Sequence, residues 1–406
     1  MIIALTGNDG SGKTTLGKML ARSLAAEYRP VAKLEEFDYP LIRMFRKLAG
    51  PTKTIQTQTE TRQGSKQPLS LKLLPYIQWA DSLLQTAKFK LFARHVTVIK
   101  DRCAYDYIAT WRELGVTNRF VEFLYRLLPK PDVTFYMYVE PATSLARRSK
   151  QPEKNSGKGL NFYQLKTQLY DDIYRHNRIA LVDNNGNAQQ ALAQIKALLA
   201  TREKLTSVKS IALSGLDGAG KTTTSEQLSE LLHQLNVGHV VVHFYYNYLI
   251  LKLLGLLKKK QPDDETARNL RSLETEKKHT ESRKSKLWVM FVLSDAALQY
   301  AFYRLFAFRR LIVFDRFFHD YLVSFDFLKA PHNKQRLLHI FPKPDRYFLQ
   351  IADYNVLHQR KPEHSPEFFA ACYQKYQALA RETGMIILDS THQPPNQITQ
   401  ALLGRL

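Results

Sequence analysis

One pattern of eight residues, G-x-x-x-x-G-K-T, occurs twice in the chain, at residues 7–14 and at residues 215–222. Each copy directly follows a short apolar run, at residues 2–5 and at residues 211–213. A buried strand that leads through a glycine-rich loop into a helix presents free backbone N–H groups to an anion. The repeated pattern therefore predicts two phosphate-binding units in tandem, the arrangement that duplication of a whole domain would produce.

Apolar runs recur in the same order in both halves, and they predict the fold class. Each run is short, continuous and rich in β-branched or aromatic residues, which is typical of a parallel strand covered on both faces. Segments with helical spacing, such as residues 15–26 and 223–235, separate the runs. We therefore expect an α/β protein with two P-loop NTPase domains, each a parallel sheet of about five strands flanked by helices. The expected strands are residues 2–5, 31–34, 96–99, 133–139 and 179–182, and then 211–213, 239–243, 311–314, 346–351 and 385–388.

The length of 406 residues fits two domains of about 200 residues, each able to bury its own core. A turn at residues 184–187 and a charged link at residues 202–204 close the first half. The predicted domains are therefore residues 1–205 and residues 206–406. A polar segment at a matching position in each half is interpreted as a surface insertion, a substrate-side loop or a solvated helix. These segments are residues 50–67 and 261–286.

The formal net charge of +22 allows two interpretations. It could serve an anionic partner such as nucleic acid, or it could reflect solvation and two phosphate sites that each need lysine and arginine. The two cysteines, Cys103 and Cys372, lie in different halves, which excludes a disulfide framework or zinc site and favours a reducing cytoplasm. The most apolar stretch, residues 287–308, contains charged residues and predicts a buried or amphipathic helix rather than a membrane span. Met1 is not followed by a signal-peptide pattern.

The two glycine-rich loops predict where a nucleotide binds. Glycine lets the backbone approach a phosphate closely and adopt positive φ. The lysine would reach the β- and γ-phosphates, and the following threonine would offer its hydroxyl to Mg²⁺, so ATP and Mg²⁺ are the predicted cofactors. The predicted nucleotide-binding residues are Gly7, Asp9, Gly10, Gly12, Lys13, Thr14 and Thr15 in the first loop, and Gly215, Asp217, Gly218, Gly220, Lys221, Thr222 and Thr223 in the second.

An acid–base pair ends the third expected strand of each half, Asp101-Arg102 in the first and Asp315-Arg316 in the second. An aspartate at the carboxyl end of a strand, facing a phosphate loop, can hold Mg²⁺ directly or through water. The adjacent arginine can bind the phosphate of an acceptor with its planar guanidinium group. The predicted metal ligands are Thr14, Asp101, Thr222 and Asp315.

A second aspartate follows each pair after a fixed interval, Asp106 in the first half and Asp320 in the second. Its carboxylate could contact the acceptor, or it could cap the helix that follows the strand. Both interpretations stay open at the level of the sequence.

A basic cluster follows the fourth expected strand of each half. The clusters are Arg147-Arg148 and Arg360-Lys361, each seven and eight positions beyond an acidic residue, Glu140 or Asp353. Basic side chains on a flap over the phosphates would neutralise the charge that spreads during phosphoryl transfer. The alternative is an exposed helix end that is merely solvated.

These motifs, together with the phrases Leu-Pro-Lys-Pro-Asp at 128–132 and Phe-Pro-Lys-Pro-Asp at 341–345, resemble thymidylate kinase and its nucleoside-monophosphate kinase relatives. The resemblance covers most of both halves and implies a tandem thymidylate kinase-like protein. It implies that the acidic residue of the loop lies near the acceptor sugar and that the arginine of the acid–base pair binds the acceptor phosphate. It also implies that an arginine of the lid takes part in phosphoryl transfer. By position, these roles would fall to Asp9 and Asp217, to Arg102 and Arg316, and to Arg147 and Arg360.

The chain also departs from that family on the acceptor side. Thymidylate kinases carry an arginine on the long helix before the third strand, yet residues 75–86 and 287–303 contain none. The R-E-P-G phrase after the second strand is missing, and residues 35–40 and 244–247 stand in its place. The motifs therefore predict the donor side of a reaction and leave the acceptor open.

The leading hypothesis is an ATP- and Mg²⁺-dependent kinase that phosphorylates a nucleoside monophosphate or a related acceptor. The acceptor could instead be a sugar, a glycan or a hydroxyl of modified nucleic acid. A hypothesis from another class is a nucleotide-gated nucleic-acid-binding protein, and one half could be regulatory. Analogy with single-domain relatives adds an internal pseudo-dimer or a homodimer. The predicted catalytic residues are Lys13, Asp101, Arg102, Arg147, Lys221, Asp315, Arg316 and Arg360.

Overall fold

The computed structural model divides the chain into two compact units. The first comprises Met1–Ala200 with His233–Asn236, and the second comprises Thr201–Leu232 with Val237–Leu406. The predicted domain ranges, 1–205 and 206–406, stay predictions. The residues described are 1–27, 30–34, 69–92, 96–150, 158–244, 283–327, 332–362 and 365–406. The polar segment 50–67, nearly all of the segment 261–286, and the stretches 35–40 and 245–247 lie outside them.

The first unit contains a five-stranded sheet in which every neighbouring pair of strands is parallel. The strand order is β2-β3-β1-β4-β5, so β1 lies at the centre and is buried along its whole length. Central, doubly covered strands are the positions where continuous apolar runs are stable. The strands are β1 (Ile2–Thr6), β2 (Val31–Leu34), β3 (Thr97–Lys100), β4 (Val133–Tyr138) and β5 (Ala180–Asp183).

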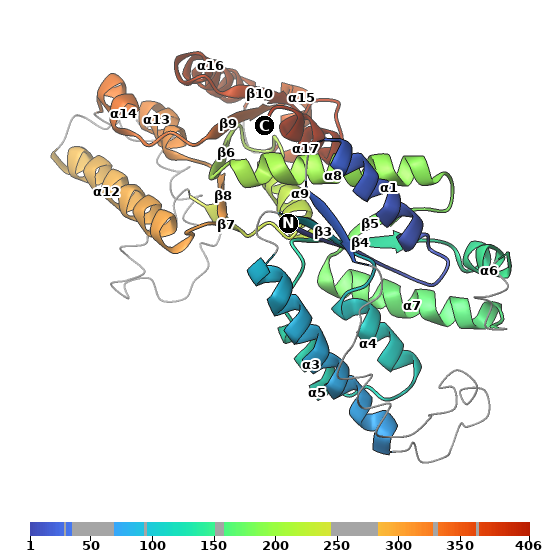
Figure 1. Ribbon diagram of the computed structural model, residues 1–406. Helices are drawn as coiled ribbons and strands as arrows, with labels where there is room; N and C mark the ends of the chain where they lie inside the picture. The colour runs from blue at the N-terminus through green and yellow to red at the C-terminus, as the bar shows by residue number, and fades with distance from the viewer. Residues whose placement is uncertain are drawn as a thin grey trace. The chain divides into compact units, whose positions relative to one another are not determined.

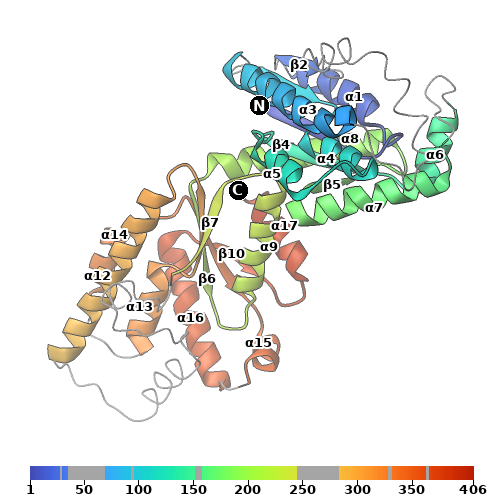
Figure 2. The ribbon, with the colours of Figure 1, turned by 90° about the horizontal axis from the view of Figure 1, so that it is seen from below.

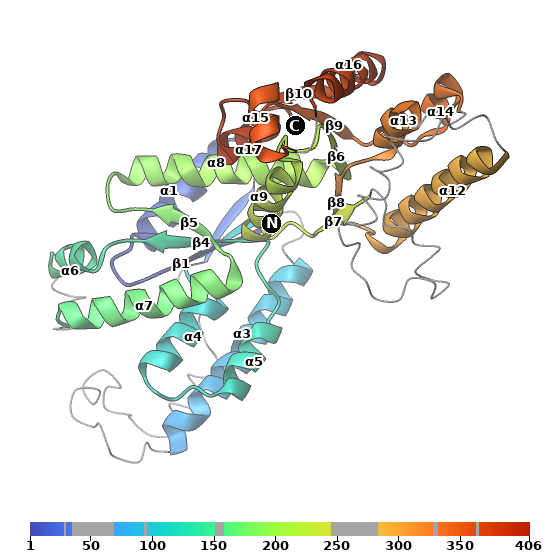
Figure 3. The ribbon, with the colours of Figure 1, turned by 180° about the vertical axis from the view of Figure 1, so that it is seen from behind.

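Helices cover both faces of the first sheet. Figures 1 and 3 show α1 on one face and α4 with α7 on the other. The core between α3, α4, α5, α7 and the sheet is rich in tyrosine, including the fully buried Tyr125 and Tyr136. The helices are α1 (Lys13–Ala26), α3 (Leu69–Phe92), α4 (Ala104–Glu113), α5 (Arg119–Leu127), α6 (Pro141–Ser149), α7 (Leu160–Asn177) and α8 (Ala188–Ser207).

The second unit repeats this topology. Its parallel sheet has the order β10-β9-β6-β8-β7, which is the order of the first sheet once each strand is matched to its counterpart. The strand that precedes the glycine-rich loop, β6, again lies at the centre and is buried throughout. The strands are β6 (Ser210–Gly215), β7 (His239–His243), β8 (Leu311–Asp315), β9 (Arg346–Ile351) and β10 (Ile386–Asp389).

The helices of the second unit also form two layers. Figure 2 shows α9 and α17 on one side of the sheet and α13 with α16 on the other. A cluster of buried aromatic rings, with Phe244 against Phe314 and Phe317, fills the core beside α13. The helices are α9 (Lys221–Gln234), α12 (Arg283–Phe306), α13 (Phe318–Phe327), α14 (Lys334–Ile340), α15 (Tyr354–Arg360), α16 (Pro366–Thr383) and α17 (Pro395–Gly404).

The most apolar stretch of the sequence forms α12, as expected. This helix buries Val289, Val292 and Ala296 on one side, while the apolar side chains of Leu298 and Leu305 are exposed, so the helix is only partly buried. Within the described ranges, none of the helices combines the length and the apolar character that crossing a membrane requires.

Candidate functional site

Both glycine-rich loops leave the carboxyl end of a central strand, which is where ligands bind in open parallel sheets. The first glycine of each loop, Gly7 or Gly215, has a positive φ, 144° or 136°. A Cβ atom on Gly7 would lie 2.6 Å from the carbonyl oxygen of Met137, and one on Gly215 would lie even closer to the carbonyl of Gln350. Only glycine fits these turns, because the neighbouring strand leaves no room for a side chain.

The loop lysines are buried and point back onto their own loops. The Lys13 ammonium donates to the carbonyl oxygens of Gly7 at 2.7 Å and Asn8 at 2.9 Å. The Lys221 ammonium donates to Gly215 at 2.9 Å and to the next carbonyl at 2.8 Å. Burial lowers the pKa of Lys221 to about 8, and it lowers the pKa of Lys13 as well. Each loop therefore encloses a positive charge that is poorly hydrated and available to an anion.

The four predicted metal ligands come together as two pairs. The Thr14 hydroxyl donates to Asp101 Oδ2 at 2.5 Å, and the Thr222 hydroxyl donates to Asp315 Oδ2 at 2.9 Å. Asp101 Oδ1 is buried and has no hydrogen-bond partner among the described residues. Carboxylate and hydroxyl oxygens are ligands that Mg²⁺ accepts.

The donor set also indicates what kind of metal site this is. In the part of the chain that the structure describes, no three His, Cys, Asp or Glu side chains converge as a metal site would require. One carboxylate and one hydroxyl in each half fit an Mg²⁺ ion that completes its shell with phosphate oxygens and water. They do not form a permanent cage of protein ligands.

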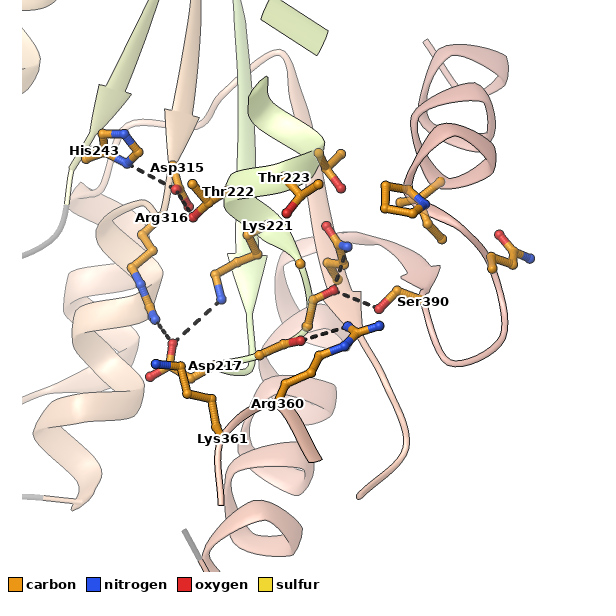
Figure 4. A pocket seen from close by; sticks show the side chains of 18 residues that line it. Asp217, Lys221, Thr222, Thr223, His243, Asp315, Arg316, Arg360, Lys361 and Ser390 are labelled. Carbon is orange, nitrogen blue, oxygen red and sulfur yellow. Dashed lines mark hydrogen bonds and ion pairs between the residues drawn. The ribbon is translucent and has the colours of Figure 1, made fainter. Parts of the chain in front are cut away.

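The second loop lines a cavity of about 560 Å³, which is large enough for a nucleotide-sized ligand. Figure 4 shows Lys221 and Arg316 directed at Asp217, and Thr222 directed at Asp315. Thr223 lines the cavity as well, whereas its counterpart Thr15 is simply exposed at the start of α1. The other predicted residues that line this cavity are Gly218, Gly220 and Arg360.

Among the polar residues of this cavity that were not predicted from the sequence, three contact the loop or the acid–base pair. His243 ends β7, and its Nδ1 lies 3.0 Å from Asp315 Oδ2. Gln350 Nε2 and Ser390 Oγ both donate to the carbonyl of Ala219 in the loop, at 2.7 and 2.8 Å. The available signal was a polar residue at or just beyond the carboxyl end of an apolar run. In the first unit Asn184, which follows β5, holds the loop in the same way, donating to the Ser11 carbonyl at 2.8 Å.

The acidic residue of the first loop is surrounded by cations. Asp9 lies 3.8 Å from Arg102, 3.5 Å from Arg148 and 3.8 Å from Lys166 on α7. Burial alone would raise the pKa of Asp9, but these cations and Lys13 hold it well below its usual range. An excess of positive charge at one carboxylate is suited to binding a further anion.

The acidic residue of the second loop has fewer cationic neighbours. Asp217 bonds to Arg316 and lies 3.8 Å from the Lys221 ammonium, and its side chain is 49% exposed. The arginine of the acid–base pair therefore contacts the loop acid in both units.

The second aspartates cap helices. Asp106 accepts from the Cys103 N–H at 2.8 Å at the start of α4 and from the Tyr170 hydroxyl at 2.9 Å. Asp320 accepts from the Phe317 N–H at 2.9 Å before α13, and it is 1% exposed. Of the two interpretations of these residues, the geometry supports the helix cap.

The basic clusters lie beside the loops, but not in the same way. Arg360 Nη1 donates to the Gly218 carbonyl at 2.9 Å. Arg147, at the matching position, donates instead to the carbonyl of Asn184 at 2.8 Å. In the first unit it is Arg148 that reaches the loop acid, as described above. The transfer role of Arg147 stays a prediction.

Comparisons with known proteins support one family. The thymidylate kinase family model matches residues 5–195. A probable thymidylate kinase of Sulfolobus acidocaldarius is 27% identical over 200 residues, which is 48% of this chain and 91% of that protein. The probable thymidylate kinase of Methanocaldococcus jannaschii is 31% identical over 149 residues, 36% of this chain and 69% of its own length. That of Pyrobaculum aerophilum is 24% identical over 200 residues, covering 48% of this chain and 95% of the relative.

Each of these matches spans at most about half of this chain, as expected if one relative corresponds to one of two repeated units. The loop, the threonine–aspartate pair and the arginine beside it lie together at the carboxyl end of each sheet. The fold, this geometry and the matches together show that the chain belongs to the thymidylate kinase family and is a P-loop nucleotide kinase.

Proposed function

We propose that both units transfer the γ-phosphoryl group of ATP, with Mg²⁺, to a nucleoside monophosphate or a related phosphorylated acceptor. The observation that supports this proposal is that both units contain the full set of residues expected to bind ATP and Mg²⁺. Each unit has a buried loop lysine, a threonine–aspartate pair and an arginine next to that aspartate. A unit kept only for regulation would not need all three parts.

On the donor side, the loop and its lysine would bind the β- and γ-phosphates. The loop N–H groups and the start of the following helix favour negative charge at that position. Mg²⁺, when bound, would neutralise part of the charge on the phosphates. Thr14 with Asp101, and Thr222 with Asp315, are the residues that would hold it.

On the acceptor side, Arg102 and Arg316 would bind the phosphate of the acceptor and hold it in line with the transferred group. The cations around Asp9 support a phosphorylated acceptor in the first unit, although one of them, Lys166, also pairs with Glu113 at 3.0 Å. Nucleic-acid binding and dimer formation have no support of this kind and stay predictions.

The proposal is tested by measuring ADP release from ATP and Mg²⁺ with a panel of ribo- and deoxyribonucleoside monophosphates, nucleosides and sugars. We expect at least one monophosphate to stimulate ADP release well above the level with ATP alone. The double variant K13A/K221A should abolish that stimulation. K18A, an exposed lysine on α1 outside the loop, is the matched control. A panel in which no acceptor stimulates the wild-type chain would refute the proposal.

A further inference from the structure

A second cavity, of about 540 Å³, lies in the second unit. Arg346 and Tyr347, at the start of β9, line this cavity, whereas Gln350, near the end of the same strand, lines the cavity at the phosphate loop. The two cavities therefore lie toward opposite ends of β9. The remaining walls come from α13, α14, the segment before β9, and the ends of α16 and α17, elements that Figure 1 labels.

A buried histidine lines the cavity. His319 is 2% exposed, and its ring lies against the rings of Phe317, Phe341 and Tyr347 at centroid distances of 6.1, 5.7 and 5.0 Å. Its Nδ1 has no hydrogen-bond partner within the described ranges. Burial and the nearby Lys343 lower the pKa of His319 to about 4, so the ring is neutral near pH 7. A buried polar nitrogen without a partner is rare in folded proteins.

The charged residues of the cavity leave an excess of positive charge. Lys343, Arg346 and Arg405 all line it. Arg346 donates to an oxygen of Leu406, the last residue, at 2.9 Å, whereas Arg405 donates to the uncharged backbone carbonyl of Ile387.

The carboxylates of the cavity are engaged with other groups. Glu382 pairs with Lys334 at 2.8 Å. Asp345 accepts the backbone N–H groups of Lys209 and Ser210 at 2.6 and 3.0 Å. Leu338, Pro344 and Ile386 add an apolar wall. Cationic groups, a neutral histidine and an apolar wall together suit an anion that carries an organic body.

Among the described residues of the first unit, the matching place has a much smaller space. The matching region holds a cavity of only about 40 Å³, lined among others by Tyr105 and Lys130. Lys130 belongs to the repeated Pro-Lys-Pro-Asp phrase and corresponds to Lys343, whereas Tyr105 stands where the second unit has His319. The large cavity is therefore a property of the second unit, even though its lysine is part of the repeat.

Hydrogen bonds connect this cavity to the second phosphate loop. The Tyr347 hydroxyl lies 2.9 Å from Ser214 Oγ, which donates to Asp320 Oδ2 at 2.5 Å. Asp320 Oδ1 lies 3.7 Å from Arg316 Nη1, and Arg316 bonds to Asp217. A ligand that shifts the Tyr347 ring would therefore act on the arginine of the acid–base pair.

In the first unit, threonines stand at both corresponding positions. Thr134 replaces Tyr347 and Thr6 replaces Ser214, and Thr6 Oγ1 has no hydrogen-bond partner among the residues described. In the part of the chain that the structure describes, this connection is therefore found in the second unit and not in the first.

We propose that this cavity binds a phosphorylated small molecule of nucleotide size and that binding changes the activity of the second unit through Tyr347 and Arg316. The binding step does not depend on the proposed function, whereas the effect on activity rests on it. Lys343 and Arg405 would contact the phosphate, and His319 would bond to a polar group of the ligand.

Binding is tested with the full chain carrying K13A and K221A, so that both phosphate loops are weakened. Isothermal titration calorimetry with inorganic pyrophosphate, with AMP and with dTTP should detect binding of at least one probe. Adding K343A and R405A should raise the Kd about tenfold or more, because two direct phosphate contacts are lost. K130A, the matching lysine of the first unit, should leave the Kd unchanged. Both substituted residues are exposed, so the fold should survive.

No difference between the K343A/R405A and K130A isotherms, or no binding of any probe, would overturn the site. The coupling is tested separately in the K13A chain, where only the second unit works. The probe that binds should change its rate of ADP release at least twofold, and Tyr347→Phe should reduce that response. Binding without any change of rate would overturn the coupling and leave the site standing. Absence of kinase activity would overturn the proposed function, while the calorimetry would still report on binding.

Discussion

The two phosphate loops share their donor apparatus and differ in what surrounds their acidic residue. Asp9 lies among Arg102, Arg148 and Lys166, whereas Asp217 is half exposed beside Arg316 and the loop lysine. Both units therefore keep the residues proposed to bind the donor phosphates, and they differ around the residues proposed to bind the acceptor.

One helix position accounts for much of the difference. Tyr170 on α7 and Tyr376 on α16 donate to equivalent aspartates, so they align the two helices. Four residues before them stand Lys166 in the first unit and Cys372 in the second. The first unit therefore places an additional cation at its loop, where the second places a buried, uncharged thiol.

The largest expected effect tests whether both units work. K13A and K221A should each lower the rate of phosphoryl transfer by their own unit about 10³-fold. The reason is that the transferred phosphate loses its contact with the lysine ammonium. Since the other unit is intact, each single variant should keep part of the total ADP release. Complete loss from one variant and none from the other would show that only one unit is catalytic.

The next effect concerns the free energy of unfolding and His319, a position at which the first unit has Tyr105. The pKa of His319 is about 4 in the fold and about 6.5 when exposed, so the unfolded chain binds the proton more readily between these values. Stability is therefore fully present above about pH 6.5 and falls as the pH drops toward 4, by about 3 kcal/mol in total. Urea unfolding at pH 7 and pH 4.5 should show this loss.

His319→Gln provides the control for that measurement. The glutamine variant should lose most of the additional acid sensitivity, because its side chain does not titrate. Equal pH dependence of the wild type and the variant would exclude His319 as the source.

A smaller effect should separate the two acceptor sides. Measured in the K221A chain, so that only the first unit acts, K166A should raise the KM for a monophosphate acceptor about tenfold, close to 1.4 kcal/mol. The KM for ATP should change little, since the contacts of Lys166 are with Asp9 and Glu113. Cys372→Ala in the K13A chain is the matched control and should leave both constants unchanged.

The smallest effect concerns how each loop is held. Asn184→Ala removes the bond to the Ser11 carbonyl and should weaken ATP binding by the first unit about fivefold, since one such bond contributes about 1 kcal/mol. Ser390→Ala should have less effect in the second unit, because Gln350 donates to the same carbonyl. Affinity is measured by titrating an ATP analogue into the K221A chain for the first unit and into the K13A chain for the second. Equal losses of affinity for the two variants would contradict this difference.

Part of the site follows from the sequence because it depends on local geometry. A strand, three glycines and a helix start are contiguous residues, so the loops around Lys13 and Lys221 could be predicted from their pattern. The aspartates that accept from Thr14 and Thr222 could also be predicted, because parallel strands end at the same edge of a sheet. The choice between a cap and an acceptor contact at Asp106 and Asp320 could not, since both fit the same spacing.

Other parts depend on contacts between distant segments. The sequence pattern of α7 does not show that Lys166 lies at the loop acid, and no motif marks Gln350 or Ser390 as supports of the loop. The choice between Arg147 and Arg148 depends on the rotation of a short helix, which a motif does not define. Side-chain direction at a sheet edge is fixed by packing, and packing is not visible in a spacing pattern.

Two tandem P-loop folds, their central strands and the loop residues proposed to face the donor phosphates follow from the sequence, because backbone constraints on glycine and strand order are local and repeated. The tertiary structure alone decided which cations surround each loop acid and where the second cavity lies. Among the described residues, it also placed a connection between such a cavity and the phosphate loop in the second unit and not in the first. Crossover connections bring residues from remote segments to one edge of a sheet, and their charges and volumes combine only after folding.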